Sequence, residues 1–205
     1  MYHCHQFYPR VDNREFITKS MNEVFILLGS NRGERLDYIT RAIEMIAVSA
    51  GTILRKSAVY ESEPWGFEDQ VSFLNQVAEI ETALTPEALL EQLLTIEVKL
   101  GRVRPFDGCG CGLPAQPGND TGNKSGVAPV YAGRTIDLDI LFYGQRLVFT
   151  DSLMIPHPRL HERRFTLVPM EEIAPAFVHP MLKKSISALL KECRDVANVK
   201  KLAHV

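Results

Sequence analysis

Apolar residues in this 205-residue chain follow two spacings, which predict two kinds of element. Alternation of apolar and polar positions predicts half-buried β-strands, whereas apolar residues three or four apart predict amphipathic helices. Up to residue 143 the two patterns follow one another in a regular way. The predicted order is a strand at 24–28, a helix at 36–50, strands at 52–60 and 73–82, a helix at 85–100 and a strand at 133–143.

The second of these helices has clear boundaries in the sequence. Thr85 is a preferred helix-capping residue, and Pro86 suits the first helical turn because that position needs no N–H donor. Gly101 is placed to end the helix. The residues expected on its buried face are Leu89, Leu93, Ile96 and Leu100. Two shorter helices are predicted at 165–175 and 186–196.

Two segments lack apolar periodicity. Residues 1–20 are expected to form a flexible tail, since Met21 directly precedes the first strand pattern, and residues 21–205 are expected to form a single domain. Residues 106–130 are rich in glycine and proline and have almost no apolar content, so they predict a long flexible loop insert. Long loops inside compact domains are often lids over active sites.

The most informative stretch is the predicted strand that contains Asp137 and Asp139. One apolar residue separates them, so both carboxylates lie on the same face of the strand. Two carboxylates this close repel each other unless a cation lies between them, and a pair of Mg²⁺ ions is the natural ligand. Arg134 beside them is a candidate phosphate ligand. An exposed edge strand with two surface aspartates is the alternative.

Composition limits the possible partners. The chain is 45% hydrophobic and 23% charged, as expected for one globular domain with a sizeable core. A formal charge of −2 and a pI near 6.3 give no overall attraction to nucleic acid or an anionic membrane. A polyanion must therefore meet a local cluster of arginines, and a small nucleotide suits that better than a duplex. No run of about 18 apolar residues is present, so the cytoplasm is the expected location.

Further candidate phosphate ligands lie at two places. Arg102 and Arg104 follow the second helix, where alternating arginines suit phosphate oxygens. Residues 155–165 form the densest local patch of His and Arg. In contrast, Ser30 lies in a turn that lacks the lysine and the glycine pattern of phosphate-binding loops, so a plain tight turn is predicted there.

A planar ligand is suggested by aromatic residues and one amide. Trp65 and Phe67 lie in a polar loop, and Phe73 and Asn75 share one face of the next strand. Aromatic rings stack on flat ligands, and an Asn offers a donor and an acceptor to the edge of a heterocycle. The alternative is that the loop aromatics cover a satellite core and that Asn75 satisfies backbone groups.

Together these motifs resemble the 6-hydroxymethyl-7,8-dihydropterin pyrophosphokinase family, from about residue 24 to residue 174. The matching stretches are Leu28–Asn31, Tyr60–Pro64, Phe73–Asn75, Ile96–Glu97, Gly101–Arg104, Arg134–Ile140, Ile155–His157, Arg163 and Phe165. Each stretch is short, but their order and spacing are specific.

The resemblance implies an α+β fold, a ferredoxin-like α/β sandwich with a mostly antiparallel sheet flanked by helices. It implies an enzyme that transfers diphosphate from ATP to 6-hydroxymethyl-7,8-dihydropterin, giving AMP and the pterin diphosphate, in folate biosynthesis. Two Mg²⁺ ions would be held by Asp137 and Asp139, with ATP as co-substrate. The partners are then small molecules, with no nucleic acid and no membrane, and a monomer is favoured.

The resemblance also assigns site residues. Those expected in catalysis are Arg102, Arg104, Arg134, Asp137 and Asp139. Those expected around ATP are Glu97, Arg104, Tyr131, Arg134, Ile140, His157 and Arg163. Those expected around the pterin are Ser62, Trp65, Phe73, Asn75 and Phe165. Catalysis would be in-line attack by the hydroxymethyl oxygen on the β-phosphorus, with metals and arginines stabilising the transferring group.

The insert departs from the family pattern. Just before Arg134 the family usually places a basic residue and an aromatic, whereas residues 130–133 of this chain are Val, Tyr, Ala and Gly. Lys124 is the only lysine or arginine between Arg104 and Arg134. The residue that replaces the family's basic loop residue is therefore open.

Two other functions stay open at this point. A Mg²⁺-dependent nucleotidyltransferase also combines a Gly-Ser turn with two aspartates, but there the two lie close in sequence, whereas Ser30 and Asp137 are far apart here. A non-catalytic ferredoxin-like module that binds a ligand would need neither aspartate and would leave ATP intact.

Overall fold

The computed structural model describes residues 21–63, 71–102 and 134–203. Outside these ranges lie the expected tail at 1–20, the aromatics Trp65 and Phe67, the site candidates Arg104 and Tyr131, and the insert at 106–130. What the sequence predicts for them, and for the domain boundaries, stays a prediction. Within the described ranges, none of the helices combines the length and the hydropathy of a membrane-spanning segment.

The described residues form an antiparallel sheet around one long strand, β1 (Asn22–Ser30). On one side β1 pairs with β5 (Asp137–Tyr143), and on the other with β4 (Phe73–Thr82). Along its length β4 pairs with two shorter strands, β2 (Thr52–Lys56) and β3 (Tyr60–Ser62). The C-terminal strand β8 (Val199–Lys201) completes the sheet beside β3.

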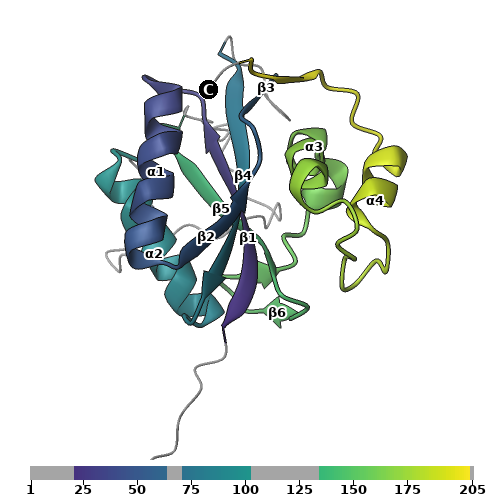
Figure 1. Ribbon diagram of the computed structural model, residues 1–205, viewed down its shortest axis with the longest axis horizontal. Helices are drawn as coiled ribbons and strands as arrows, with labels where there is room; N and C mark the ends of the chain where they lie inside the picture. The colour runs from purple at the N-terminus through teal and green to yellow at the C-terminus, as the bar shows by residue number, and fades with distance from the viewer. Residues whose placement is uncertain (1–20, 64–70, 103–133, 204–205) are drawn as a thin grey trace, which may run out of the picture.

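Helices cover both faces of this sheet, so the molecule has three layers (Figure 1). One face packs against α1 (Arg35–Ser49) and α2 (Pro86–Lys99), and the other against α3 (Arg164–Ile173) and α4 (Ile186–Glu192). The central strand is apolar on both faces for this reason. Val24, Ile26 and Leu28 belong to the core with α1 and α2, whereas Phe25 and Leu27 belong to the core with α3 and α4.

Helix α2 forms as its sequence predicts. The Thr85 hydroxyl accepts a hydrogen bond from the backbone N–H of Ala88 at 3.2 Å, and Pro86 begins the helix. The four residues expected to be buried, Leu89, Leu93, Ile96 and Leu100, are all in the core. Local capping and apolar spacing therefore agree about where α2 begins and which face it buries.

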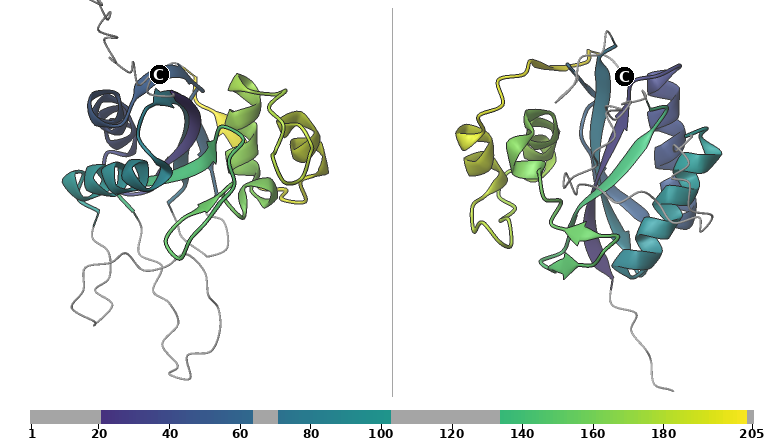
Figure 2. Two further views of the ribbon diagram at one scale, coloured as in Figure 1. Left: turned by 90° about the horizontal axis from the view of Figure 1, so that it is seen from below. Right: turned by 180° about the vertical axis from the view of Figure 1, so that it is seen from behind.

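After β5 the chain forms a small hairpin, β6 (Val148–Phe149) with β7 (Met154–Ile155), and then a 3₁₀ turn at Leu160–Glu162. The hairpin lies at the end of the sheet where β1 begins, as the right-hand view of Figure 2 shows. Beyond it, the backbone N–H of His157 donates to the carbonyl of Leu141 at 3.0 Å. This bond fastens the segment that leads to α3 against the outer edge of β5.

The expected α+β, ferredoxin-like sandwich with a mostly antiparallel sheet is confirmed, and three details differ. The predicted strand 52–60 is split, because Ser57 leaves the strand to bond with Val77: its backbone N–H donates at 2.9 Å and its hydroxyl accepts at 3.0 Å. The last helix ends at Glu192, since Asp195 turns back to accept the N–H of Arg164 at 2.9 Å. The sequence analysis did not predict β8 at all.

A first prediction concerns Gly51, which lies between α1 and β2. A β-carbon at this position would lie 2.4 Å from the backbone oxygen of Glu81, which cannot move without disturbing β4. We expect Gly51→Ala to lower the free energy of unfolding by roughly 1–3 kcal/mol. Val48→Ala, at an exposed position of α1, is the control and should change it by less than about 0.5 kcal/mol. Equal urea midpoints for the two variants would contradict this account of the close approach.

Candidate active site

The candidate site lies at one end of the sheet face that packs against α3. Phe25 and Leu27 of β1 fill the apolar core on this face, and Gly29 is the next residue of β1 on the same side. Gly29 lies opposite Asn75 of β4 and opposite Asp137 of β5. Since Gly29 has no side chain, nothing from β1 stands between the side chains of Asn75 and Asp137. Beyond Leu27 the face therefore changes from apolar to polar.

Two arginines hold the Asp137 carboxylate. Its Oδ1 accepts a hydrogen bond from Nη1 of Arg102, just after α2, and its Oδ2 accepts one from Nη1 of Arg134. Burial by itself raises the pKa of this carboxyl, but the charges of Arg134 and Arg102 and their hydrogen bonds outweigh burial and hold the pKa below its ordinary value. Asp137 is thus a carboxylate at neutral pH.

Glu97 fastens α2 to the same strand. Its side chain is only 1% exposed, and its Oε1 accepts hydrogen bonds from the backbone N–H of Leu138, at 2.8 Å, and from Nη1 of Arg102. Leu138 lies between the two aspartates on β5, at the edge of the sheet. Glu97 thereby satisfies a strand N–H that points away from β1, and it sets the position of the aspartate pair. Its expected contact with ATP stays a prediction.

Asp139 has a different environment from Asp137. Burial raises its pKa to about 7, the negative charge of Asp137 adds to the rise, and the positive charge of Arg163 opposes it. Among the described residues, none donates a hydrogen bond to the Asp139 carboxylate. A carboxyl group that is partly buried and has no donor is costly in its charged form, so Asp139 favours either a proton or a cation.

His157 and Arg163 border the aspartates on the side of α3. Burial lowers the pKa of His157 to about 4, and the charge of Arg163 lowers it further, so the imidazole is neutral at pH 7. Burial likewise lowers the pKa of Arg163, while Asp139 opposes that shift. The guanidinium of Arg163 lies 5.7 Å from the centre of the Phe165 ring, within reach of a cation–π contact.

On the other side of Gly29 lie the residues expected to bind a flat ligand. Nδ2 of Asn75 donates to Oγ of Ser62 at 2.9 Å, and both side chains are buried. Ser62 and Phe73 face each other across the β3–β4 pair. The structure therefore brings Ser62, Phe73 and Asn75 together at one end of the sheet. Phe165 is the second residue of α3 and packs against the core of the same face.

The aspartate pair fits a metal that takes some of its ligands from a substrate. Within the described ranges, no group of three or more His, Cys, Asp or Glu side chains is arranged to hold an ion. Magnesium usually binds to one or two carboxylates together with substrate phosphates and water. Asp137 and Asp139 supply oxygens of this kind, and the oxygens of Asp139 have no donor among the described residues.

The structure places the remaining candidates as follows. The side chain of Ile140 is buried in the core with α1 and α2, so a contact between Ile140 and a nucleotide would come from its backbone. Trp65, Arg104 and Tyr131 lie outside the described residues.

Sequence reasoning missed Asn31, whose Oδ1 accepts the backbone N–H of Arg134 at 2.7 Å. The only signal was the Gly-Ser-Asn turn, which by itself does not name its partner. The Ser30 hydroxyl donates to the carbonyl of Thr135 at 2.6 Å, in agreement with a structural turn.

The chain matches the family described as 7,8-dihydro-6-hydroxymethylpterin-pyrophosphokinase (HPPK) over residues 25–112 and 118–175. A Bacillus subtilis protein named 2-amino-4-hydroxy-6-hydroxymethyldihydropteridine pyrophosphokinase is 37% identical over 153 residues, which are 74% of this chain and 78% of that protein. A protein of the same name from Aquifex aeolicus is 35% identical over 172 residues, 84% of this chain and 92% of that protein.

Some relatives are much longer than this chain. The folic acid synthesis protein fol1 of Pneumocystis carinii is 38% identical over 172 residues, but the match spans only 20% of its length. Among solved structures, a Plasmodium falciparum HPPK-DHPS triple mutant matches with a TM-score of 0.65 and 14% identity, over 86% of this chain and 45% of that one. At this identity the structural match shows the fold alone.

A second prediction follows from the environment of Asp139. An unfolded aspartate loses its proton near pH 4, whereas Asp139 in the metal-free fold keeps it to about pH 7. Between these values the folded state binds more protons, so the free energy of unfolding falls as the pH rises from about 4 to 7. We expect Asp139→Asn to remove this fall and to stabilise the metal-free protein at pH 8 by roughly 1–4 kcal/mol.

Urea unfolding in a chelating buffer at pH 5 and pH 8 measures this effect. Asp151→Asn, at an exposed bend, is the matched control and should keep the wild-type pH dependence. An Asp139→Asn variant that loses stability between pH 5 and pH 8 as steeply as the wild type would show that Asp139 titrates normally.

Proposed function

The chain belongs to the 7,8-dihydro-6-hydroxymethylpterin-pyrophosphokinase family, and from that premise we propose the function of its site. The protein transfers the β,γ-diphosphate of ATP to 6-hydroxymethyl-7,8-dihydropterin, giving AMP and the pterin diphosphate, as a step of folate biosynthesis. The observation that carries this proposal is the row Asn75, Gly29 and Asp137 across three neighbouring strands. It sets an amide suited to a heterocycle beside a carboxylate suited to a phosphate-bound metal.

The pterin binds on the β3–β4 side of Gly29. Phe73 and Phe165 supply aromatic faces, while Asn75 and Ser62 supply hydrogen-bonding groups for the ring edge. The bond from Asn75 to Ser62 fixes the direction in which the Asn75 amide points. The resemblance adds Trp65 to this side.

ATP binds on the β5 side, where the charged residues lie. Arg102 and Arg134 now bond to Asp137, and the phosphate oxygens of ATP are stronger, multiply charged partners for the same guanidinium groups. When ATP binds, these arginines turn from Asp137 to the transferring diphosphate. His157 is neutral and serves as a hydrogen-bond partner of ATP, whereas Arg163 supplies positive charge for its phosphates. Arg104, Tyr131, Glu97 and the backbone of Ile140 are the further nucleotide contacts.

Asp137 and Asp139 hold magnesium, two ions according to the resemblance, together with ATP. When bound, the metal would supply positive charge that offsets the negative charge of the triphosphate. Asp137 is ready for this role because it is already ionised, whereas Asp139 must first lose its proton. The affinity of Asp139 for a cation would therefore fall as the pH drops below about 7, because the proton and the cation compete for the same carboxylate.

The reaction itself is a direct displacement. The hydroxymethyl oxygen of the pterin attacks the β-phosphorus, a new O–P bond forms, and the bond from the β-phosphorus to the α–β bridging oxygen breaks, which releases AMP. The proton of the hydroxyl group passes to water. Arg102 and Arg134 stabilise the negative charge of the transferring group. No side chain is required as a covalent nucleophile. Orientation of the two substrates and electrostatic stabilisation supply the rate acceleration.

The protein acts in the cytoplasm on these small molecules, as a monomer, without nucleic acid or membrane. The formal charge of −2 supports the absence of nucleic-acid and membrane partners, because the positive charge of the site is local and is balanced by its own carboxylates. The nucleotidyltransferase alternative is disfavoured because the Ser30 hydroxyl donates its one hydrogen to the carbonyl of Thr135 and so has none to donate to a phosphate.

Product analysis tests the function. Purified protein is incubated with ATP and Mg²⁺, with and without 6-hydroxymethyl-7,8-dihydropterin, and the nucleotides are separated by chromatography. We expect AMP to form only when the pterin is present, in an amount equal to the pterin diphosphate. Release of free pyrophosphate would favour the nucleotidyltransferase, and intact ATP under all conditions would favour the non-catalytic module.

A third prediction concerns the two aspartates. Asp137→Asn and Asp139→Asn should each lower kcat at least about 100-fold, because an amide holds a dication much less well than a carboxylate does. Circular dichroism should show the wild-type fold in both. Asp151→Asn serves as the exposed control and should keep full activity. Full turnover in both site variants would mean that neither carboxylate binds the metal.

A fourth prediction concerns the pterin side. Asn75→Ala and Phe165→Ala should each weaken pterin binding by roughly 1–3 kcal/mol, through lost hydrogen bonds and lost stacking, with little change in the binding of ATP alone. Calorimetric titration with each ligand measures both effects. The exposed aromatic Phe149, replaced in Phe149→Ala, is the control. Equal losses for the two ligands would mean that Asn75 and Phe165 support the fold and contact no pterin.

A further inference from the structure

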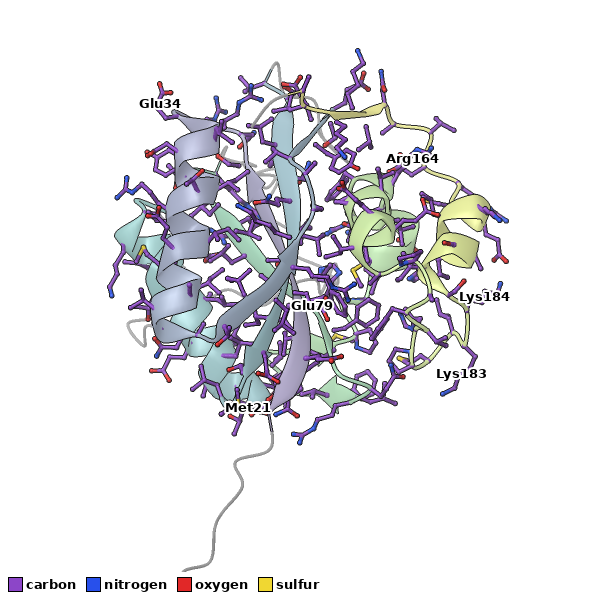
Figure 3. The ribbon with its side chains drawn as sticks, viewed as in Figure 1. Met21, Glu34, Glu79, Arg164, Lys183 and Lys184 are labelled. Carbon is purple, nitrogen blue, oxygen red and sulfur yellow. The ribbon has the colours of Figure 1, made fainter. Side chains whose placement is uncertain are left out.

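The turn between β1 and α1 contacts the nucleotide side of the site through Arg134 and the strands of the pterin side through Glu61. It runs from Ser30, the last residue of β1, to Arg35, the first residue of α1. Glu34, which precedes Arg35, is labelled in Figure 3 and marks the end of α1 at which this turn lies. In Figure 1 strand β3 lies at the same end of the sheet.

One half of the turn holds the nucleotide side. The backbone N–H of Asn31 donates to the carbonyl of Arg134 at 3.1 Å, and Oδ1 of Asn31 accepts the N–H of Arg134 at 2.7 Å. Next to this pair, the Ser30 hydroxyl bonds to the carbonyl of Thr135 at 2.6 Å. The backbone of Arg134 is thus fixed on both sides, just before the strand that carries Asp137.

The other half of the turn holds the strands of the pterin side. Nη1 of Arg35 donates to Oε1 of Glu61 at 3.1 Å, to the carbonyl of Ser72 at 2.8 Å and to the Ser72 hydroxyl at 2.9 Å. The Ser72 hydroxyl in turn donates to Oε1 of Glu61 at 2.5 Å. We name these three residues, Arg35, Glu61 and Ser72, the Arg35 cluster.

The Arg35 cluster acts from behind the site. Successive residues of a strand point to opposite faces, so Glu61 of β3 faces α1 while its neighbour Ser62 faces the site. Ser72 likewise directly precedes Phe73, the partner of Ser62 across the β3–β4 pair. The cluster therefore joins the immediate neighbours of two pterin-side residues without occupying the space in which the pterin would bind.

The stability contribution of this cluster is expected to be small. The side chain of Arg35 is 28% exposed and that of Glu61 is 36% exposed. Ion pairs with this much solvent contact add little to the free energy of unfolding, because water already stabilises both charges. A geometric role, in which the cluster sets the spacing of the ends of β3 and β4, is more consistent with three acceptors that converge on one guanidinium nitrogen.

We propose that Arg35 is a positioning residue for the pterin: through Glu61 and Ser72 it sets the separation of Ser62 and Phe73. In the same turn, Asn31 is the positioning residue for the nucleotide, through the backbone of Arg134. The proposal rests on the pterin kinase function given above. Its specific content is that two residues of one short turn act on two different substrates.

Steady-state kinetics with each substrate varied in turn tests this double assignment. Arg35→Ala should raise the KM for the pterin about tenfold or more and leave the KM for ATP within about twofold. Asn31→Ala should raise the KM for ATP about tenfold or more and leave the KM for the pterin within about twofold. Arg35→Lys keeps a charged donor that reaches toward the same acceptors, so it should restore most of the pterin KM.

Two further variants separate positioning from stability. Arg41→Ala removes an exposed arginine of α1 and should change neither KM. Arg55→Ala breaks another ion pair of the sheet, with the buried Glu79, which lies in the middle of the sheet in Figure 3. It should lower the melting temperature at least as much as Arg35→Ala does, yet leave the pterin KM unchanged.

The kinetic results separate a failure of the proposed function from a failure of the positioning role. If the wild type forms no AMP from ATP and the pterin, the proposed function fails and this inference fails with it. If the wild type is active but Arg35→Ala raises both KM values equally, or lowers only the melting temperature, the function stands and the positioning role is overturned. A rise in the pterin KM alone, reversed by Arg35→Lys, supports it.

Discussion

The structure depends on a cluster of paired, partly buried charges at one end of its sheet. The carboxylates are Glu97, Asp137 and Asp139, and the guanidinium groups are Arg102, Arg134 and Arg163. Buried charges are tolerated only when they are paired, so every element that carries one is held in place by the others. The end of α2 and the strand β5 are joined in this way. The same charges make the cluster responsive to a polyanion and a dication, which offer each member a new partner.

The order of residues along β1 also explains why one face of the sheet both packs against helices and carries the candidate site. Phe25 and Leu27 pack against α3 and α4 and give that face a stable apolar region, and the polar region begins at the next residue on the same side, Gly29. The amide of Asn75 and the carboxylate of Asp137 flank that glycine on two neighbouring strands. The proposed pterin side and the proposed nucleotide side thus adjoin at this end of the sheet, which is where a transferred diphosphate would have to pass between them.

The sequence predicted those parts of the fold that depend on local patterns. Apolar spacing gave α1, α2 and β4 nearly to the residue, and alternation placed Asp137 and Asp139 on one face. What it missed depends on contacts between distant segments. Asn31 meets Arg134, and Arg35 meets Glu61 and Ser72, through folding alone. The pKa of Asp139 is likewise set by burial and by Arg163, and β8 is too short and too charged to show a strand pattern.

The central claim is that Asp137 exchanges its arginine partners for a metal when substrates bind. A crystal structure with Mg²⁺, a non-hydrolysable ATP analogue and the pterin tests it most directly. We predict magnesium bound to both Asp137 and Asp139, and Arg102 and Arg134 bonded to phosphate oxygens, with the pterin between Phe73 and Phe165. A complex in which both arginines still bond to Asp137, with the metal elsewhere, would contradict the account.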